Sequence, residues 1–143
     1  YCQKERGRWE KLQARCAPYQ VDAPLFWDPP LDKDMAKLMA WHYELRLPRL
    51  YEMGFPHNNC GGECVKAGQA QWALLYRTRP DRFFHNADEE EALRQYLGKN
   101  VTILRDRTGG RRKPLTLHAF AKRLEQQPEL PLPNDWQGCD CFA

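Results

Sequence analysis

Hydrophobic residues recur at helical spacing in several separate stretches of the chain. Between Gln3 and Cys16, the residues Trp9, Leu12 and Cys16 are spaced as on one face of a helix and lie among charged residues. This pattern predicts an amphipathic helix that ends before Pro18.

A second helix is predicted after a proline-rich passage. The four prolines between Pro18 and Pro30 exclude a regular helix there. Asp32 or Asp34 can cap a helix that continues to about Leu45. Because its apolar side chains fall on one stripe, we expect it to be a core helix. The stripe consists of Met35, Leu38, Met39, His42 and Leu45.

A third helix is predicted to begin at about Gly61 and to run to Pro80, with Asn58 and Asn59 as candidate caps. This helix would carry Cys60 and Cys64 about one turn apart at its amino end. There, unpaired backbone N–H groups and the helix dipole favour a thiolate.

The carboxy-terminal half adds two helices and a hairpin. Acidic residues from Asp88 to Glu91 suit the amino end of a fourth helix, and Gly98 suits its end. The periodicity then changes to that of short strands. The elements expected next are a strand Val101–Leu104, a turn Thr108–Gly110, a return strand Lys113–Leu117, a helix His118–Gln126 and an irregular tail Pro128–Ala143.

The fold class is therefore mainly α with a short β-hairpin, in a single domain over 1–143. A chain of 143 residues with 42% hydrophobic content can bury one modest core. No stretch is apolar enough for a membrane span and no secretory segment is visible, so we expect a cytoplasmic protein without a membrane partner. The chain begins at Tyr1 rather than Met, from which we expect a missing upstream portion.

The cysteines are unevenly placed. Cys60 and Cys64 form one doublet, Cys139 and Cys141 form a second, and the other two cysteines are isolated. If the tail folds back, the four thiolates complete a site that suits zinc or an iron–sulfur cluster. The alternative is that Cys60 and Cys64 are small buried residues and the tail thiols are simply exposed.

The histidines allow weaker hypotheses. His57 precedes the first doublet and can be a metal ligand, a proton carrier or a turn residue bonded to nearby backbone. We interpret His42, His85 and His118 as structural. Glu63 is expected to be solvated rather than catalytic.

A cluster of positive charge surrounds the predicted glycine turn. Its net charge can hold a phosphate or a nucleic-acid backbone, although an exposed hairpin tip is the alternative. The candidate phosphate or nucleic-acid contacts are Arg105, Arg107, Arg111, Arg112 and Lys113. Over the whole chain the net charge is only +3, which by itself does not argue for such a partner.

The run Leu47–Gln69, LPRLYEMGFPHNNCGGECVKAGQ, resembles the carboxy-terminal half of proteins related to phosphoadenosine phosphosulfate reductase, in the adenine nucleotide alpha-hydrolase superfamily. Weaker similarity extends through Pro80–Phe83, the acidic helix, Val101–Arg107 and Leu115–Leu117 to the Cys139 and Cys141 tail. The resemblance implies an upstream α/β domain with a glycine- and serine-rich loop that binds ATP or a related nucleotide. The chain itself has no Walker-type loop, no GxSxG and no GxGxxG motif.

Two functions from different classes remain open. In the first, the chain is the carboxy-terminal helical portion of a larger α/β protein, a nucleotide-dependent sulfur-transfer or reductase-like enzyme that is not active without its upstream domain or subunit. The resemblance favours an iron–sulfur cluster on Cys60, Cys64, Cys139 and Cys141. In the second, the same cysteines bind structural zinc in a non-enzymatic module whose basic hairpin engages nucleic acid or a protein.

Overall fold

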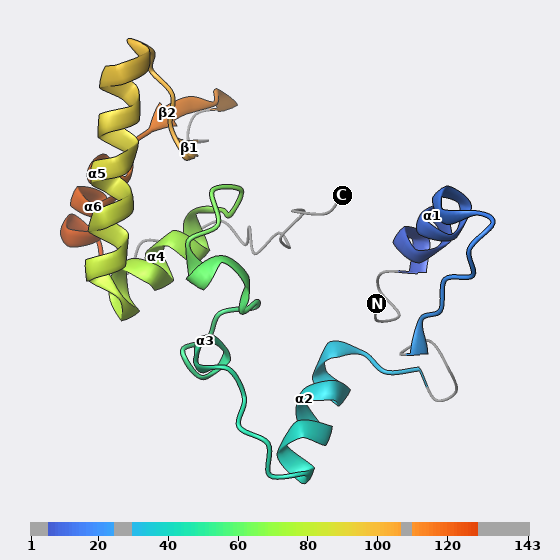
Figure 1. Cartoon of the computed structure of the whole chain (residues 1–143). Helices are drawn as coiled ribbons and strands as arrows, with labels where there is room; N and C mark the ends of the chain where they lie inside the picture. Colours follow the sequence, from blue (N-terminus) through green and yellow to red (C-terminus); the bar gives the residue numbers. More distant parts are fainter. Residues whose placement is uncertain (1–5, 25–29, 107–109, 129–143) are drawn as a thin grey trace. The chain divides into compact units, whose positions relative to one another are not determined.

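The computed structural model describes residues 6–24, 30–106 and 110–128, and these residues are mainly helical with one two-stranded antiparallel hairpin, as predicted (Figure 1). The described residues divide into two compact units, one that ends at Leu47 and one that begins at Pro48. The helices of the first unit are α1 (Arg6–Cys16) and α2 (Lys33–His42). The second unit contains α3 (Arg49–Glu52), a 3-10 helix η3 (Asn59–Gly62), α4 (Gln69–Thr78), α5 (Pro80–Leu97), β1 (Leu104–Asp106), β2 (Lys113–Leu115) and α6 (Leu117–Gln126).

Helix α2 begins where the sequence predicts and ends three residues early. The carboxylate of Asp32 accepts hydrogen bonds from the backbone N–H groups of Asp34 and Met35, at 2.9 Å each. At the other end, Glu44 adopts a left-handed conformation with φ 54°. The N–H of Leu45 then bonds back to the carbonyl of Ala40 at 2.8 Å, which closes the helix.

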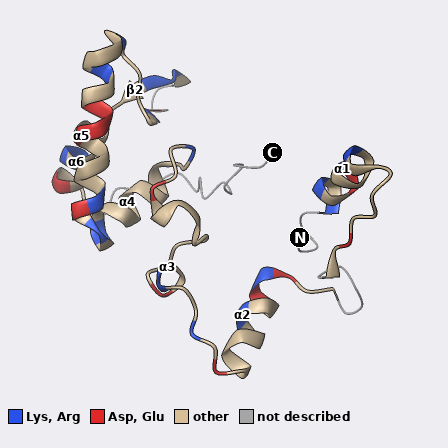
Figure 2. Cartoon of the chain, in the orientation of Figure 1, with Lys and Arg blue, Asp and Glu red and all other residues tan. Residues whose placement is uncertain are grey.

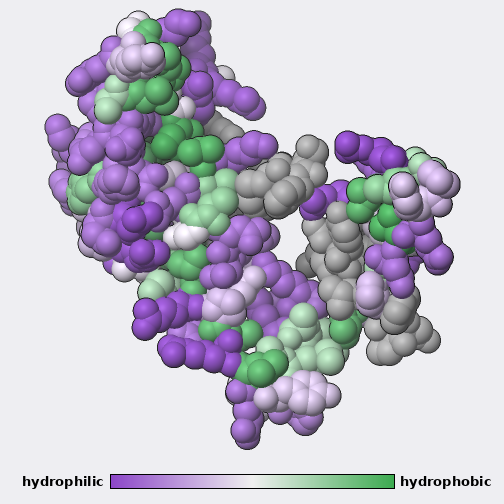
Figure 3. Space-filling model, in the orientation of Figure 1, coloured by the Kyte–Doolittle hydropathy of each residue, from purple (hydrophilic) through white to green (hydrophobic). Residues whose placement is uncertain are grey.

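The prediction that α2 is a core helix is wrong. Met35 and Leu38, on its apolar stripe, are 48% and 59% exposed, and the helix has no buried residue. The space-filling view shows hydrophobic surface over α2 (Figure 3). The spacing of its apolar residues was identified correctly, but amphipathic spacing alone does not determine whether a helix face is covered.

The core of the second unit lies between α4, α5, α6 and the hairpin. Trp72 and Phe83 are completely buried and meet edge to face, with ring centroids 6.1 Å apart. Tyr76 contacts the same Phe83 ring at 5.2 Å. Phe120 from α6 is also fully buried, and α5 and α6 lie side by side (Figure 1).

Helix α5 begins at Pro80, a full two turns before the acidic start that the sequence suggested. Proline is well suited to the first turn of a helix, because its fixed φ is helical and its missing N–H would have no helical partner there. The acidic residues Asp88–Glu91 therefore lie inside the helix, and the prediction that they mark its amino end is wrong. Its carboxyl end is as predicted, with Gly98 left-handed at φ 58°.

The hairpin is confirmed, with its first strand displaced. β1 starts at Leu104, the last residue of the predicted strand, and pairs Leu104 with Leu115 and Asp106 with Lys113. Helix α6 begins one residue earlier than predicted, where the hydroxyl of Thr116 accepts a hydrogen bond from Ala119 N at 3.2 Å.

One buried carboxylate joins these elements. Glu90 on α5 accepts hydrogen bonds from the backbone N–H of Ile103, which precedes β1, and from that of Leu117 at the start of α6, each at 2.7 Å. A second contact joins α6 to the hairpin, where Arg123 of α6 bonds to Asp106 of β1 at 2.6 Å. The hairpin and α6 are thus both tied to the middle of α5.

Replacing Glu90 by Gln should destabilise the second unit by about 1–3 kcal/mol, because the amide has one oxygen to accept and leaves one buried N–H without an acceptor. Urea unfolding followed by circular dichroism measures this loss. Glu89→Gln, an exposed position on the same helix, should change stability by less than about 0.5 kcal/mol. Equal losses for the two variants would contradict the bridging role of Glu90.

Candidate functional site

The segment that carries Cys60 and Cys64 is not the start of a long helix. Cys60 lies in the 3-10 turn η3 and Cys64 follows that turn, while α4 begins only at Gln69. The predicted helix from Gly61 to Pro80 is therefore wrong at its amino end. Cys60, Gly61 and Gly62 have successive φ values of 55°, 59° and 88°. Three consecutive left-handed residues cannot belong to a right-handed helix, and glycine at two of them makes the turn accessible.

Because the turn is left-handed, the predicted helix-dipole stabilisation of the two thiolates does not apply. Cys60 is exposed, whereas Cys64 is buried at 7% exposure among core residues that include Phe55. The alternative in which both cysteines are small buried residues is therefore wrong for Cys60. A non-glycine residue held in the left-handed region is a feature that clusters at functional sites.

The turn packs tightly against the rest of the unit through Gly62. A Cβ on Gly62 would lie 2.8 Å from the ring of Phe55. The carbonyl of Gly62 accepts a buried hydrogen bond from the side-chain amide of Gln71 on α4, at 2.9 Å. Glycine is thus required here by both conformation and space.

A salt bridge fixes the residue between the cysteines to α5. The Glu63 carboxylate accepts two hydrogen bonds from the guanidinium of Arg82, at 2.7 and 3.0 Å, and one from the amide of Asn86 at 2.8 Å. The Glu63 side chain is 13% exposed, so the expectation that it is solvated is wrong. Arg79 adds a longer hydrogen bond of 3.4 Å to the carbonyl of Gly61.

The groups around Glu63 determine the pKa of its carboxyl. Burial by itself raises the pKa of the Glu63 carboxyl, but the hydrogen bonds from Arg82 and Asn86 and the positive charges of Arg82 and Arg79 outweigh burial. The pKa of Glu63 therefore lies below its ordinary value of 4.5. The carboxylate stays ionised and remains engaged by Arg82 at neutral pH.

The structure describes only half of the predicted ligand set. Cys139 and Cys141 lie outside the described residues, and so does Arg107. Within 6–24, 30–106 and 110–128, no three His, Cys, Asp or Glu side chains gather closely enough to hold a metal ion. His57 is half-buried and already engages a neighbouring group. The four-cysteine centre therefore remains a prediction.

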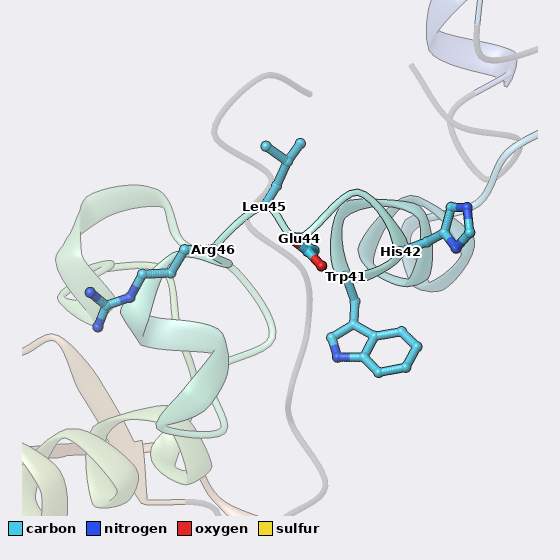
Figure 4. Close-up of a pocket in the computed structure, with 5 residues that line it drawn as sticks. All are labelled: Trp41, His42, Glu44, Leu45 and Arg46. Carbon is cyan, nitrogen blue, oxygen red and sulfur yellow. The ribbon is translucent and has the colours of Figure 1, made fainter.

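The remaining candidate residues are distant in sequence from the turn Asn59–Gly62, which we call the cysteine turn. Arg105, Arg111, Arg112 and Lys113 are all exposed on the hairpin. His118 lies 3.1 Å from an oxygen of Asp88, a contact between α6 and α5 that fits a structural role. In the first unit, His42 borders a pocket together with Trp41, Glu44, Leu45 and Arg46. Trp41, His42, Leu45 and Arg46 point in different directions, so no polar groups converge there (Figure 4).

Comparison of the chain with known protein families, with curated proteins and with solved structures finds no match. Among the described helices, none combines the length and the apolar character that crossing a membrane requires. The site must therefore be interpreted from its own chemistry.

Replacing Gly62 by Ala should destabilise the second unit by about 2–5 kcal/mol, the sum of left-handed strain and overpacking against Phe55. Gly98→Ala is the matched control, because Gly98 has φ 58° but no atom within 4 Å of an added Cβ. It should cost only the strain, about 1–2 kcal/mol. Urea unfolding of both variants measures the difference, and similar losses would show that the Phe55 contact is unimportant.

The bonds of the Glu63 carboxylate to Arg82 and Asn86 should make the stability of the second unit depend on pH in the acidic range. A carboxyl whose pKa is lowered by folding contributes stability above its unfolded pKa and loses that contribution as pH falls through the folded pKa. Glu63→Gln should therefore be less stable than the wild type at neutral pH, and the difference should vanish as pH falls well below 4.5. Unfolding measured across pH tests this, with Glu89→Gln as the exposed control.

Proposed function

We propose that this chain is the carboxy-terminal part of a nucleotide-dependent sulfur-transfer or reductase-like enzyme, in which Cys60, Cys64, Cys139 and Cys141 hold an iron–sulfur cluster. The observation that carries the proposal is the turn around Cys60, where an exposed thiol is placed by a strained left-handed backbone. Such strain persists only when the surroundings enforce it, and here Phe55, Gln71 and Arg82 do so.

The cysteine thiolates suit an iron–sulfur cluster. Thiolates are the ligands of iron–sulfur clusters, and successive backbone N–H groups in a left-handed turn form the kind of concavity in which anions and such clusters lie. Gly61 has no side chain that would keep a cluster away from the backbone of the turn, whereas the space beside Gly62 is filled by Phe55. A cluster bound here would supply one-electron transfer, while the bonds of Glu63 to Arg82 and Asn86 hold the segment between the two cysteines against α5.

Nucleotide binding would take place outside this chain. ATP or a related nucleotide would bind to an upstream domain or subunit, because this chain carries no phosphate-binding glycine loop. The resemblance to phosphoadenosine phosphosulfate reductase relatives supports this division of roles. It also fits a cytoplasmic protein, where cysteines remain reduced.

Metal analysis tests the proposal directly. The full chain purified without oxygen should contain iron and acid-labile sulfide and should show the visible absorption of iron–sulfur charge transfer. Cys60→Ser should abolish or strongly reduce the iron content without unfolding the protein, because the Cys60 side chain is exposed and supports no core packing.

Cys16→Ser is the matched control, since Cys16 is a free cysteine outside the candidate site. It should leave iron content and absorption unchanged. A colourless protein loaded with zinc would rule out the cluster and would favour the structural zinc module instead. A protein that binds neither metal would overturn the proposed centre.

A further inference from the structure

The hairpin presents a group of exposed positive charges that we call the hairpin cations, namely Arg105, Arg111, Arg112 and Lys113. Arg111, Arg112 and Lys113 make no hydrogen bond or ion pair through their side chains with any described residue. Among the described residues, the Arg105 side chain reaches only the hydroxyl of Thr102, at 3.4 Å. Blue Lys and Arg segments mark β2 and its approach (Figure 2).

The one acidic residue between Leu104 and Leu115 does not neutralise this charge. Asp106 is largely buried, with its side chain 12% exposed, and Arg123 of α6 bonds to its carboxylate at 2.6 Å. Its charge is thus balanced on the inner side of the hairpin. The exposed positions keep a net positive charge.

The strand register places cations on both faces of the ribbon. Asp106 pairs with Lys113 and Arg105 pairs with Pro114. Because paired residues share a face and successive residues alternate, Arg105 and Lys113 project to opposite faces. Arg105 lies on the outer face, whereas Lys113 is an exposed residue on the face of Leu104, Asp106 and Leu115 that packs against the core. The exposed cations of a two-stranded ribbon suit contact with the phosphates that border a nucleic-acid groove.

The ribbon lacks the features of a membrane-binding surface. Its large apolar side chains, Leu104 and Leu115, are buried in the core and cannot enter a bilayer. Three of the four hairpin cations are arginines, whose planar guanidinium groups bond to phosphate oxygens in pairs. The surface therefore fits hydrated phosphates rather than an apolar partner.

The same helix supports this ribbon and the cysteine turn. The side-chain amide of Gln69 donates to the carbonyl of Arg105 at 2.7 Å, and that of Gln71 donates to the carbonyl of Gly62 at 2.9 Å. Both glutamines lie in the first turn of α4 and are buried. The position of the ribbon is thus fixed with respect to the cysteine turn.

From these observations we infer that the hairpin is a nucleic-acid contact surface, with Arg105, Arg111, Arg112 and Lys113 bound to backbone phosphates. The inference goes beyond the proposed function and does not depend on it, since the hairpin cations need no metal. Contacts to phosphates carry affinity without sequence preference and weaken with salt.

Binding of the full chain to a fluorescently labelled DNA duplex and to its separated strand, measured by anisotropy over a range of salt, tests the inference. Arg111→Ala, Arg112→Ala and Lys113→Ala are combined in one variant. It should lose about tenfold or more in affinity at low salt, and the slope of log affinity against log salt should become shallower by about 2–3. Circular dichroism should be unchanged because the three side chains are exposed.

A second variant that combines Lys11→Ala, Arg15→Ala and Lys99→Ala removes the same charge from exposed positions elsewhere. It should bind nearly as the wild type does. Loss confined to the hairpin variant supports the inference, on duplex or on single strand. Equal losses in both variants would overturn it, as would wild-type protein that binds neither form of DNA. Hairpin-dependent binding to phosphatidylserine vesicles without binding to DNA would likewise overturn it and identify a membrane surface instead.

Discussion

The carboxylate of Glu90 is the point at which three elements of the second unit meet. It lies inside α5 and accepts the backbone N–H groups of Ile103 and Leu117, so it fixes both the approach to β1 and the first turn of α6. The buried N–H of Leu117 in particular could not be left without an acceptor at low cost. With β1 held in place, the side-chain amide of Gln69 on α4 bonds to the carbonyl of Arg105. Gln71 on the same helix bonds to the carbonyl of Gly62, so a chain of contacts links Glu90 to the cysteine turn.

Helical periodicity in the sequence was sufficient to find most of the fold. The helices around Trp9, Leu38 and Phe120 and the hairpin after Gly98 were predicted because local spacing, caps and stop signals agree there. The start of α5 was missed because Pro80 was interpreted as the end of one helix, whereas it is the first residue of the next. A proline both stops a preceding helix and suits the first turn of a following one, and the sequence alone does not distinguish these roles.

The candidate site was located from cysteine spacing, but its conformation was not predictable. The local sequence around Cys60 is compatible with a helix, yet Cys60 has a left-handed backbone. Contacts with residues outside the turn, such as Phe55 and Arg82, favour this left-handed conformation. The partners of Glu63 lie 19 and 23 residues further along the chain, on one face of α5. A local sequence pattern does not predict contacts between residues so far apart. Glu63 was therefore expected to be solvated, although its carboxylate is largely buried and hydrogen-bonded.

Two of the contacts that hold the cysteine turn differ in chemical nature. The tether to α4 joins the neutral amide of Gln71 to the carbonyl of Gly62, and it is buried and carries no net charge. The tether to α5 joins Glu63 to Arg82, which is partly open to solvent. Acid and salt act on charged, solvent-accessible pairs and hardly at all on buried neutral ones. Such conditions would therefore weaken the attachment of the turn to α5 through Glu63 and leave its attachment to α4 through Gln71 largely intact.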